Sequence, residues 1–163
     1  MCKNVAIVQA RNGSKRLPGK IFHQVGNLFL VDRVIKGLQQ SSEIDKIVIA
    51  TTTSRSDDKL VKWCSENKID FFRGSENNVL KRFYDCAVHY KAQNVIRITA
   101  DDPFKDPAII DQMLLRFYNE RLDFLCNNNP PTFPEGLDVE IFSFETLKKK
   151  NQWSVVCTGT TEV

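Results

Sequence analysis

Short apolar runs alternate with helical patterns along this chain of 163 residues. An apolar run of a few residues between polar loops is typical of a strand buried on both faces of a parallel sheet. Strands are expected at Val5–Ala10, Lys46–Thr51, Asp70–Arg73, Asn94–Thr99, Asp123–Cys126 and Asp138–Ser143. Helices are expected between or after them at Leu28–Gln40, Ser56–Asn67, Val79–Tyr90, Pro107–Tyr118 and Ser143–Lys149. The alternation predicts an α/β fold with a mostly parallel sheet.

The composition narrows the class of protein. Hydrophobic residues make up 42% and charged residues 26% of the chain, as in an ordinary soluble domain with one core. The net charge of +3 is too small to indicate a nucleic-acid partner. No apolar run is long enough for a membrane span or a signal peptide. Five cysteines without a C-x-x-C pair favour reduced thiols, so we expect a cytoplasmic protein without membrane contact.

A basic loop follows the first expected strand. Its cations and glycines are Arg11, Gly13, Lys15, Arg16, Gly19 and Lys20. Open α/β sheets bind ligands at the carboxyl ends of their strands, and glycines let backbone N–H groups approach an anion. The loop is not a Walker A loop, because five residues separate its glycines and Ile21 follows Lys20. A solvated basic turn is the alternative, but the position after the first strand favours a polyphosphate site.

Two adjacent acidic residues, Asp101 and Asp102, close the expected strand Asn94–Thr99. Because parallel strands end at the same edge of a sheet, these carboxylates are expected to face the basic loop. Carboxylates beside a polyphosphate suggest Mg²⁺, which phosphate oxygens and water would complete. The alternative is an ordinary turn before Pro103. Asp106 is expected to cap the next helix.

Two further positions are candidates for ligand contacts. Asp138 and Glu140 lie two residues apart on an expected strand and would share one face, where they could bind a metal or sugar hydroxyls. An exposed face of an edge strand explains them equally well. Arg73 follows a short strand and could contact phosphate or substrate, or it could pair with Glu76 at the surface.

Four motifs carry a resemblance to a known family: QARNGSKRLPGK, RGSENNVLKRF, RITADDPFKDPAIID and PEGLDVEIFSFETL. The first resembles the signature of the cytidylyltransferases that activate acidic sugars, including acylneuraminate and 3-deoxy-manno-octulosonate cytidylyltransferases. The other three resemble, in sequence and order, the branch of the spore coat polysaccharide biosynthesis protein SpsF. The resemblance runs from about Val5 to Leu147.

The resemblance implies a three-layer, Rossmann-like nucleotidyltransferase fold of the GT-A type. It implies CTP, Mg²⁺ and a sugar whose hydroxyl attacks the α-phosphate, so that pyrophosphate leaves and a CMP-sugar forms. Arg11, Ser14 and Lys20 would contact the triphosphate, and Asp101 would be the metal ligand. Arg73 would lie near the nucleotide or the sugar. The remaining residues expected to bind nucleotide or substrate are Ala10, Asn12, Gly13, Asp138 and Glu140.

The last residues differ from the family pattern. We expect a nucleotidyltransferase domain at residues 1–150 and an atypical tail at 151–163, in which Gln152–Val163 forms an edge strand or a disordered tail. Family members continue beyond this point, so the shortened domain is expected to form a homo-oligomer through residues from Leu137 onward. The alternative is that Trp153–Val163 folds back and covers the exposed surface within one chain. Alternatives to an active CMP-sugar synthetase are a catalytically weak nucleotide-binding remnant and an enzyme that uses another NTP.

Overall fold

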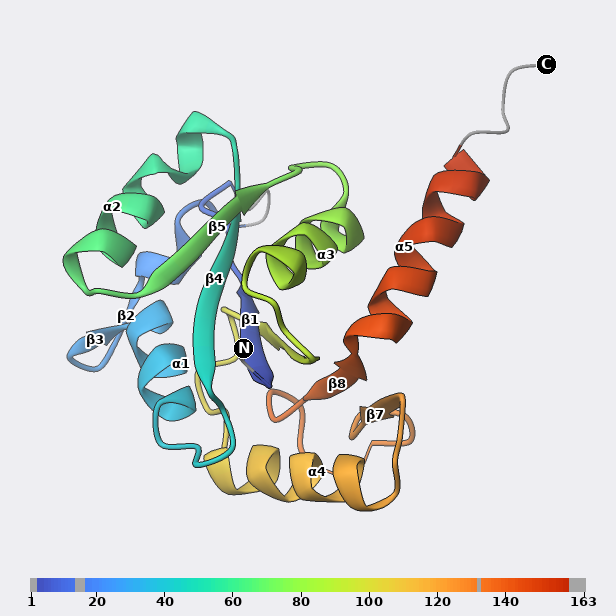
Figure 1. Cartoon of the computed structure of the whole chain (residues 1–163). Helices are drawn as coiled ribbons and strands as arrows, with labels where there is room; N and C mark the ends of the chain where they lie inside the picture. The colour runs from blue at the N-terminus through green and yellow to red at the C-terminus, as the bar shows by residue number, and fades with distance from the viewer. Residues whose placement is uncertain (1–2, 14–16, 132, 159–163) are drawn as a thin grey trace.

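The computed structural model describes residues 3–13, 17–131 and 133–158. Its main sheet has six strands in the order β5-β4-β1-β6-β8-β7 (Figure 1). The strands are β1 (Asn4–Gln9), β4 (Lys46–Thr52), β5 (Asp70–Gly74), β6 (Asn94–Thr99), β7 (Phe124–Cys126) and β8 (Glu140–Ser143). Neighbouring strands from β5 to β6 are parallel, and β8 runs antiparallel to both β6 and β7. The predicted mostly parallel α/β fold is confirmed.

Helices cover both faces of the sheet and give the molecule three layers. They are α1 (Leu30–Leu38), α2 (Asp58–Glu66), α3 (Val79–His89), α4 (Pro107–Asn119) and α5 (Phe144–Thr158). Alternate residues of β1 point to opposite faces, so Ala6 and Val8 pack with α1, α2 and α4, while Val5 and Ile7 pack with α3 and α5. Burial on both faces explains why β1 and β4 contain continuous apolar runs.

The N-terminal part departs from the sequence prediction in two places. Leu28–Phe29 forms a short strand, β3, which pairs with β2 (Gln24–Val25), so α1 begins later than expected. Gly26 makes the turn between them in the left-handed region, with φ of 67°. The helix expected from Ser56 begins instead as a 3₁₀ turn, η2 (Arg55–Asp57), before α2.

Helix α5 is longer than expected. The pattern predicted an end at Lys149, but the helix continues to Thr158 and projects away from the sheet (Figure 1). Neither Gly nor Pro occurs between Lys148 and Gln152 to end it. The expectation of an edge strand or disordered tail is therefore wrong up to Thr158, and residues 159–163 lie outside the described residues.

The cysteines Cys64 and Cys86 are core residues, as the sequence predicted. Both are fully buried and free, and burial raises the pKa of each thiol to about 12. They therefore stay protonated near neutral pH and act as small apolar side chains. In the part of the chain that the structure describes, no helix has the length and apolar character of a membrane span.

Candidate functional site

The carboxyl ends of β1, β4 and β6 lie at one edge of the sheet, which we call the rim. The register sets Gln9 opposite Ala50 on one side and Thr99 on the other, so the loops that follow these strands are neighbours. The basic loop after β1 and the Asp101–Asp102 turn after β6 therefore meet at the rim. Of the basic loop, Ser14, Lys15 and Arg16 lie outside the described residues, so their predicted roles stay predictions.

Asp57 anchors the basic loop to the end of β4. This carboxylate is 1% exposed and accepts hydrogen bonds from the backbone N–H of Asn12 at 2.6 Å and of Thr52 at 3.1 Å. The Thr52 hydroxyl donates a third bond at 2.5 Å. Asp57 was not predicted as a site residue, because its partner Asn12 lies 45 residues away in the sequence. Asp57 thus fixes where the loop after β1 leaves the sheet.

The pKa of Asp57 makes the fold sensitive to acid. Burial raises this pKa, but hydrogen bonds from the Thr52 side chain and the Asn12 backbone more than offset burial, so the net pKa lies below 3.8. A lowered carboxyl pKa contributes stability above the unfolded pKa, and this contribution is lost as the pH falls through the folded pKa. We expect the free energy of unfolding to fall between about pH 5 and pH 2, and to fall less steeply in Asp57→Ala. Urea denaturation across this pH range measures the free energy of unfolding of both proteins. The same dependence on pH in wild type and in Asp57→Ala would show that Asp57 is not the source of the acid sensitivity.

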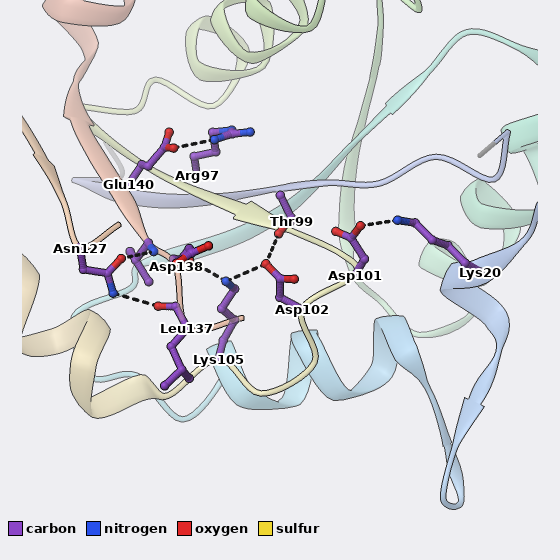
Figure 2. A network of polar contacts seen from close by, with 11 residues as sticks. Lys20, Arg97, Thr99, Asp101, Asp102, Lys105, Asn127, Leu137, Asp138 and Glu140 are labelled. Carbon is purple, nitrogen blue, oxygen red and sulfur yellow. Dashed lines mark hydrogen bonds and ion pairs between the residues drawn. The ribbon is translucent and has the colours of Figure 1, made fainter. Parts of the chain in front are cut away.

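Lys20 reaches across the rim to Asp101. Their side chains form an ion pair although they stand 81 residues apart in the sequence (Figure 2). Gly19, with φ of 72°, lets the chain turn before Lys20, and its N–H donates to the Asn12 carbonyl at 2.9 Å. Burial raises the pKa of Asp101, but the hydrogen bond and charge of Lys20 lower it to a net value below the usual range. The prediction that the carboxylates face the basic loop is confirmed for Asp101.

Asp102 has different partners from Asp101. Its Oδ2 accepts hydrogen bonds from the Thr99 hydroxyl at 2.5 Å and from the Lys105 ammonium at 3.1 Å. Lys105 also donates to the backbone carbonyl of Asp138 at 2.6 Å. Figure 2 shows these contacts as one network that runs from the end of β6 to the segment before β8.

Asp138 and Glu140 do not form the expected pair on one strand. Strand β8 begins only at Glu140, and Asp138 lies in the segment before it. Glu140 accepts a hydrogen bond from Arg97 on the neighbouring strand β6 at 2.8 Å. The lead-in segment is held by Asn127, which donates to the Leu137 carbonyl and accepts from the Val139 N–H. This segment is held by those Asn127 side-chain bonds and by one backbone bond, from the Asn127 N–H to the Val139 carbonyl at 3.4 Å, and not by a regular strand ladder.

Arg73 supports the loop after β4. Its Nε donates to the Thr52 carbonyl at 2.9 Å and its Nη2 to the Ser54 carbonyl at 2.8 Å. Its Nη1 pairs with Asp58 at 2.8 Å, so the expected alternative of a pair with Glu76 is wrong. Arg73 therefore holds the segment that carries Asp57, and its predicted contact with nucleotide or sugar stays a prediction.

Arg82 is a buried cation near the rim that the sequence did not predict as a site residue. It is 1% exposed on α3, and its Nη1 donates to the Ser75 carbonyl at 2.5 Å. Burial and then the positive charge of Arg11 lower the pKa of its guanidinium. Its Nε is among the buried polar atoms without a partner in the described residues, as are Oε1 of Gln9 and Oδ1 of Asn12. Two of these three residues end β1 or follow it, which suits a polar ligand at the rim.

The acidic residues at the rim suit a metal ion that binds together with a phosphate ligand. Among the described residues, no group of three His, Cys, Asp or Glu side chains could hold a metal alone. Mg²⁺ commonly uses only one or two carboxylates and takes its other ligands from phosphates and water. Asp101, whose side chain is 43% exposed, offers such a carboxylate beside the basic loop.

An α/β sheet with a basic loop after its first strand and an exposed carboxylate after the neighbouring strand has the arrangement in which open α/β sheets bind phosphate-bearing ligands. The model of the cytidylyltransferase family matches residues 5–157, and the chain belongs to this family. The match extends ten residues past Leu147, where the motifs that carried the resemblance end.

Individual relatives agree with this assignment. The chain is 33% identical over 147 residues to an uncharacterized protein of Methanocaldococcus jannaschii, covering 90% of this chain and 59% of that protein. It is 37% identical over 129 residues to the spore coat polysaccharide biosynthesis protein SpsF of Bacillus subtilis, covering 77% and 54%. A cytidylyltransferase structure from Leptospira borgpetersenii superimposes with a TM-score of 0.87 at 36% identity, covering 93% and 65%. The chain thus spans about half the length of the curated relatives, and its predicted resemblance to SpsF is confirmed.

Proposed function

We propose that this chain binds CTP at the rim and transfers its cytidylyl group to a sugar hydroxyl, releasing pyrophosphate. The observation that carries the proposal is the meeting of Lys20 and Asp101, which joins the basic loop to the carboxylate expected to hold Mg²⁺. Membership of the cytidylyltransferase family supports CTP as the nucleotide. Similarity to SpsF supports a sugar acceptor and a role in polysaccharide synthesis, and we expect the reaction to take place in the cytoplasm.

The residues at the rim suit this reaction. Transfer of a phosphoryl-type group depends mainly on positioning and on neutralising charge, and Arg11, Ser14 and Lys20 are assigned to the triphosphate. A bond forms between the sugar oxygen and the α-phosphorus while the bond to pyrophosphate breaks. Mg²⁺, held by Asp101 when bound, supplies positive charge to the phosphate oxygens. Arg73 keeps the loop beside the nucleotide in place.

The acceptor sugar is assigned to the side of the rim next to β8. Asp138 lies there, because Lys105 ties its backbone to Asp102. Its carboxylate is proposed to accept hydrogen bonds from sugar hydroxyls. Glu140 lies farther along β8 and is already paired with Arg97, so we assign it the role of orienting this segment.

Pyrophosphate release tests the proposed function directly. The full chain is incubated with each of the four NTPs, with and without Mg²⁺, in the presence of a panel of acidic and neutral sugars. We expect release with CTP, Mg²⁺ and an acidic sugar. Larger pyrophosphate release with another NTP would identify that NTP as the substrate instead of CTP. Tight CTP binding without pyrophosphate release under any condition would identify a nucleotide-binding remnant.

Loss of the Lys20 ammonium should weaken CTP binding. Replacing Lys20 by Ala removes a charge-assisted contact to phosphate, which costs about 1.5–3 kcal/mol, or roughly ten- to a hundredfold in affinity. Calorimetric titration of CTP measures the change. The control is Lys36→Ala, which removes an exposed lysine from α1. Equal CTP affinities of the two variants would exclude Lys20 from the phosphate site.

Self-association is proposed for the face that carries α3, β7 and α5. An apolar cavity of about 330 Å³ opens there, and Val79 and Phe124 on its wall are 38% and 49% exposed. Exposed apolar surface is buried by association. We expect a homo-oligomer in light scattering of the full chain, and its weakening by Phe124→Ser. A monomer at every concentration would reject the proposal.

A further inference from the structure

Lys105 is a buried cation that the proposed chemistry has not used. Its side chain is 1% exposed, and its ammonium contacts the Asp102 carboxylate and the Asp138 carbonyl. Helix α1 packs closely against the backbone of Lys105, because a Cβ added to Gly37 would lie 3.1 Å from the Lys105 carbonyl oxygen. A buried ammonium is tolerated only when it is paired and hydrogen-bonded, so the Asp102 pair is a condition of this packing.

The two contacts of Lys105 join separate parts of the chain. Asp102 lies in the turn after β6, and Asp138 lies 33 residues beyond Lys105 in the segment before β8. Each side is fixed independently, Asp102 by the Thr99 hydroxyl and the β8 segment by Asn127 (Figure 2). Lys105 thus sets the position of the acidic turn relative to the segment assigned to the sugar.

The two adjacent carboxylates differ in how easily their cations can leave. Asp101 is paired with Lys20, whose side chain is 27% exposed and lies in the basic loop. An incoming triphosphate can take Lys20, which frees Asp101 for a metal ion. Asp102 is paired with Lys105, and removing this carboxylate would leave a buried ammonium without its counter-ion.

We propose that Lys105 is a positioning residue that keeps Asp102 out of metal binding and leaves Asp101 as the carboxylate that takes Mg²⁺. The inference rests on the proposed CTP site. It gives a structural reason why two adjacent aspartates would have opposite roles. Lys105 itself touches neither nucleotide nor metal and acts through Asp102.

The test measures how strongly Mg²⁺ enhances CTP binding, without any turnover. CTP is titrated into the full chain by calorimetry, once with Mg²⁺ and once with EDTA, and the ratio of the two Kd values is the enhancement. Asp101→Asn should reduce the enhancement by about tenfold or more, and Asp102→Asn should leave it close to wild type. In the Lys105→Met background Asp102 is released, so Asp101→Asn/Lys105→Met should regain part of the enhancement. Adding Asp102→Asn should remove it again.

Controls separate this role from a general loss of stability. Lys46→Met removes a lysine from a pair with Asp70 at the other end of β4 and should leave the enhancement unchanged. If Lys105→Met does not fold, Lys105→Gln removes the charge and keeps a donor for the Asp138 carbonyl. An equal loss in Asp101→Asn and Asp102→Asn, or no recovery in the double variant, would overturn the inference while leaving the CTP site intact. Wild type without any CTP binding would instead reject the proposed function.

Discussion

Asp101→Asn is expected to lower Mg²⁺-dependent turnover by on the order of a hundredfold or more, because the variant loses the anionic oxygen that holds the metal. Its fold should remain intact. The only described ion pair of Asp101 is with Lys20, and both side chains are partly exposed, so the loss costs less than about 1 kcal/mol. Steady-state rates across a range of Mg²⁺ concentrations, with thermal unfolding in parallel, measure both effects.

Asp106→Asn is the matched control for this prediction. Asp106 lies in the same loop but caps α4, where its carboxylate accepts from the Ala108 N–H at 2.8 Å. Because Asn also caps helices well, this variant should keep both turnover and stability. A larger loss of turnover in Asp106→Asn than in Asp101→Asn would show that Asp101 is not the carboxylate that holds the metal ion.

Asp57→Ala is expected to give the largest loss of stability among the rim variants. The change leaves the N–H groups of Asn12 and Thr52 and the Thr52 hydroxyl without their acceptor. Buried donors without partners cost roughly 1–3 kcal/mol each, so the free energy of unfolding should fall by about 3 kcal/mol. CTP affinity should fall as well, because the basic loop loses its anchor. Urea denaturation and calorimetry measure the two quantities.

Asp58→Ala supplies the comparison. This neighbouring carboxylate is 59% exposed and pairs with Arg73 at 2.8 Å. A surface ion pair is worth about 0–1 kcal/mol, so the variant should remain close to wild type in stability and in CTP affinity. Equal destabilisation by Asp57→Ala and Asp58→Ala would show that Asp57 does not anchor the loop.

The sequence predicted the sheet because its strands are buried on both faces. The apolar runs within β1 and β4 contain no polar residue that would obscure the pattern, and Asp106 followed by Pro107 marks the start of α4. The short strands β2 and β3 were missed because two residues are too few to show a period. Helix α5 was predicted too short because the periodic apolar pattern fades before the helix ends.

The candidate site was predicted in part for a similar reason. Arg11, Lys20 and Asp101 follow apolar strands, and the parallel order of β1 and β6 brings their loops together. Asp57 and Lys105 were not predicted because their roles depend on partners far away in the sequence. Asn12 lies 45 residues from Asp57, and Asp138 lies 33 residues from Lys105. No local pattern reports such contacts.

A crystal structure of the full chain with CTP and Mg²⁺ tests the central claim most directly. The account predicts that the triphosphate lies on the basic loop after β1, and that Lys20 leaves Asp101 to contact phosphate. It further predicts a metal ion between Asp101 and the phosphate oxygens, with Asp102 still paired to Lys105. CTP bound away from the rim, or at the rim with the Lys20–Asp101 pair unbroken, would contradict the account.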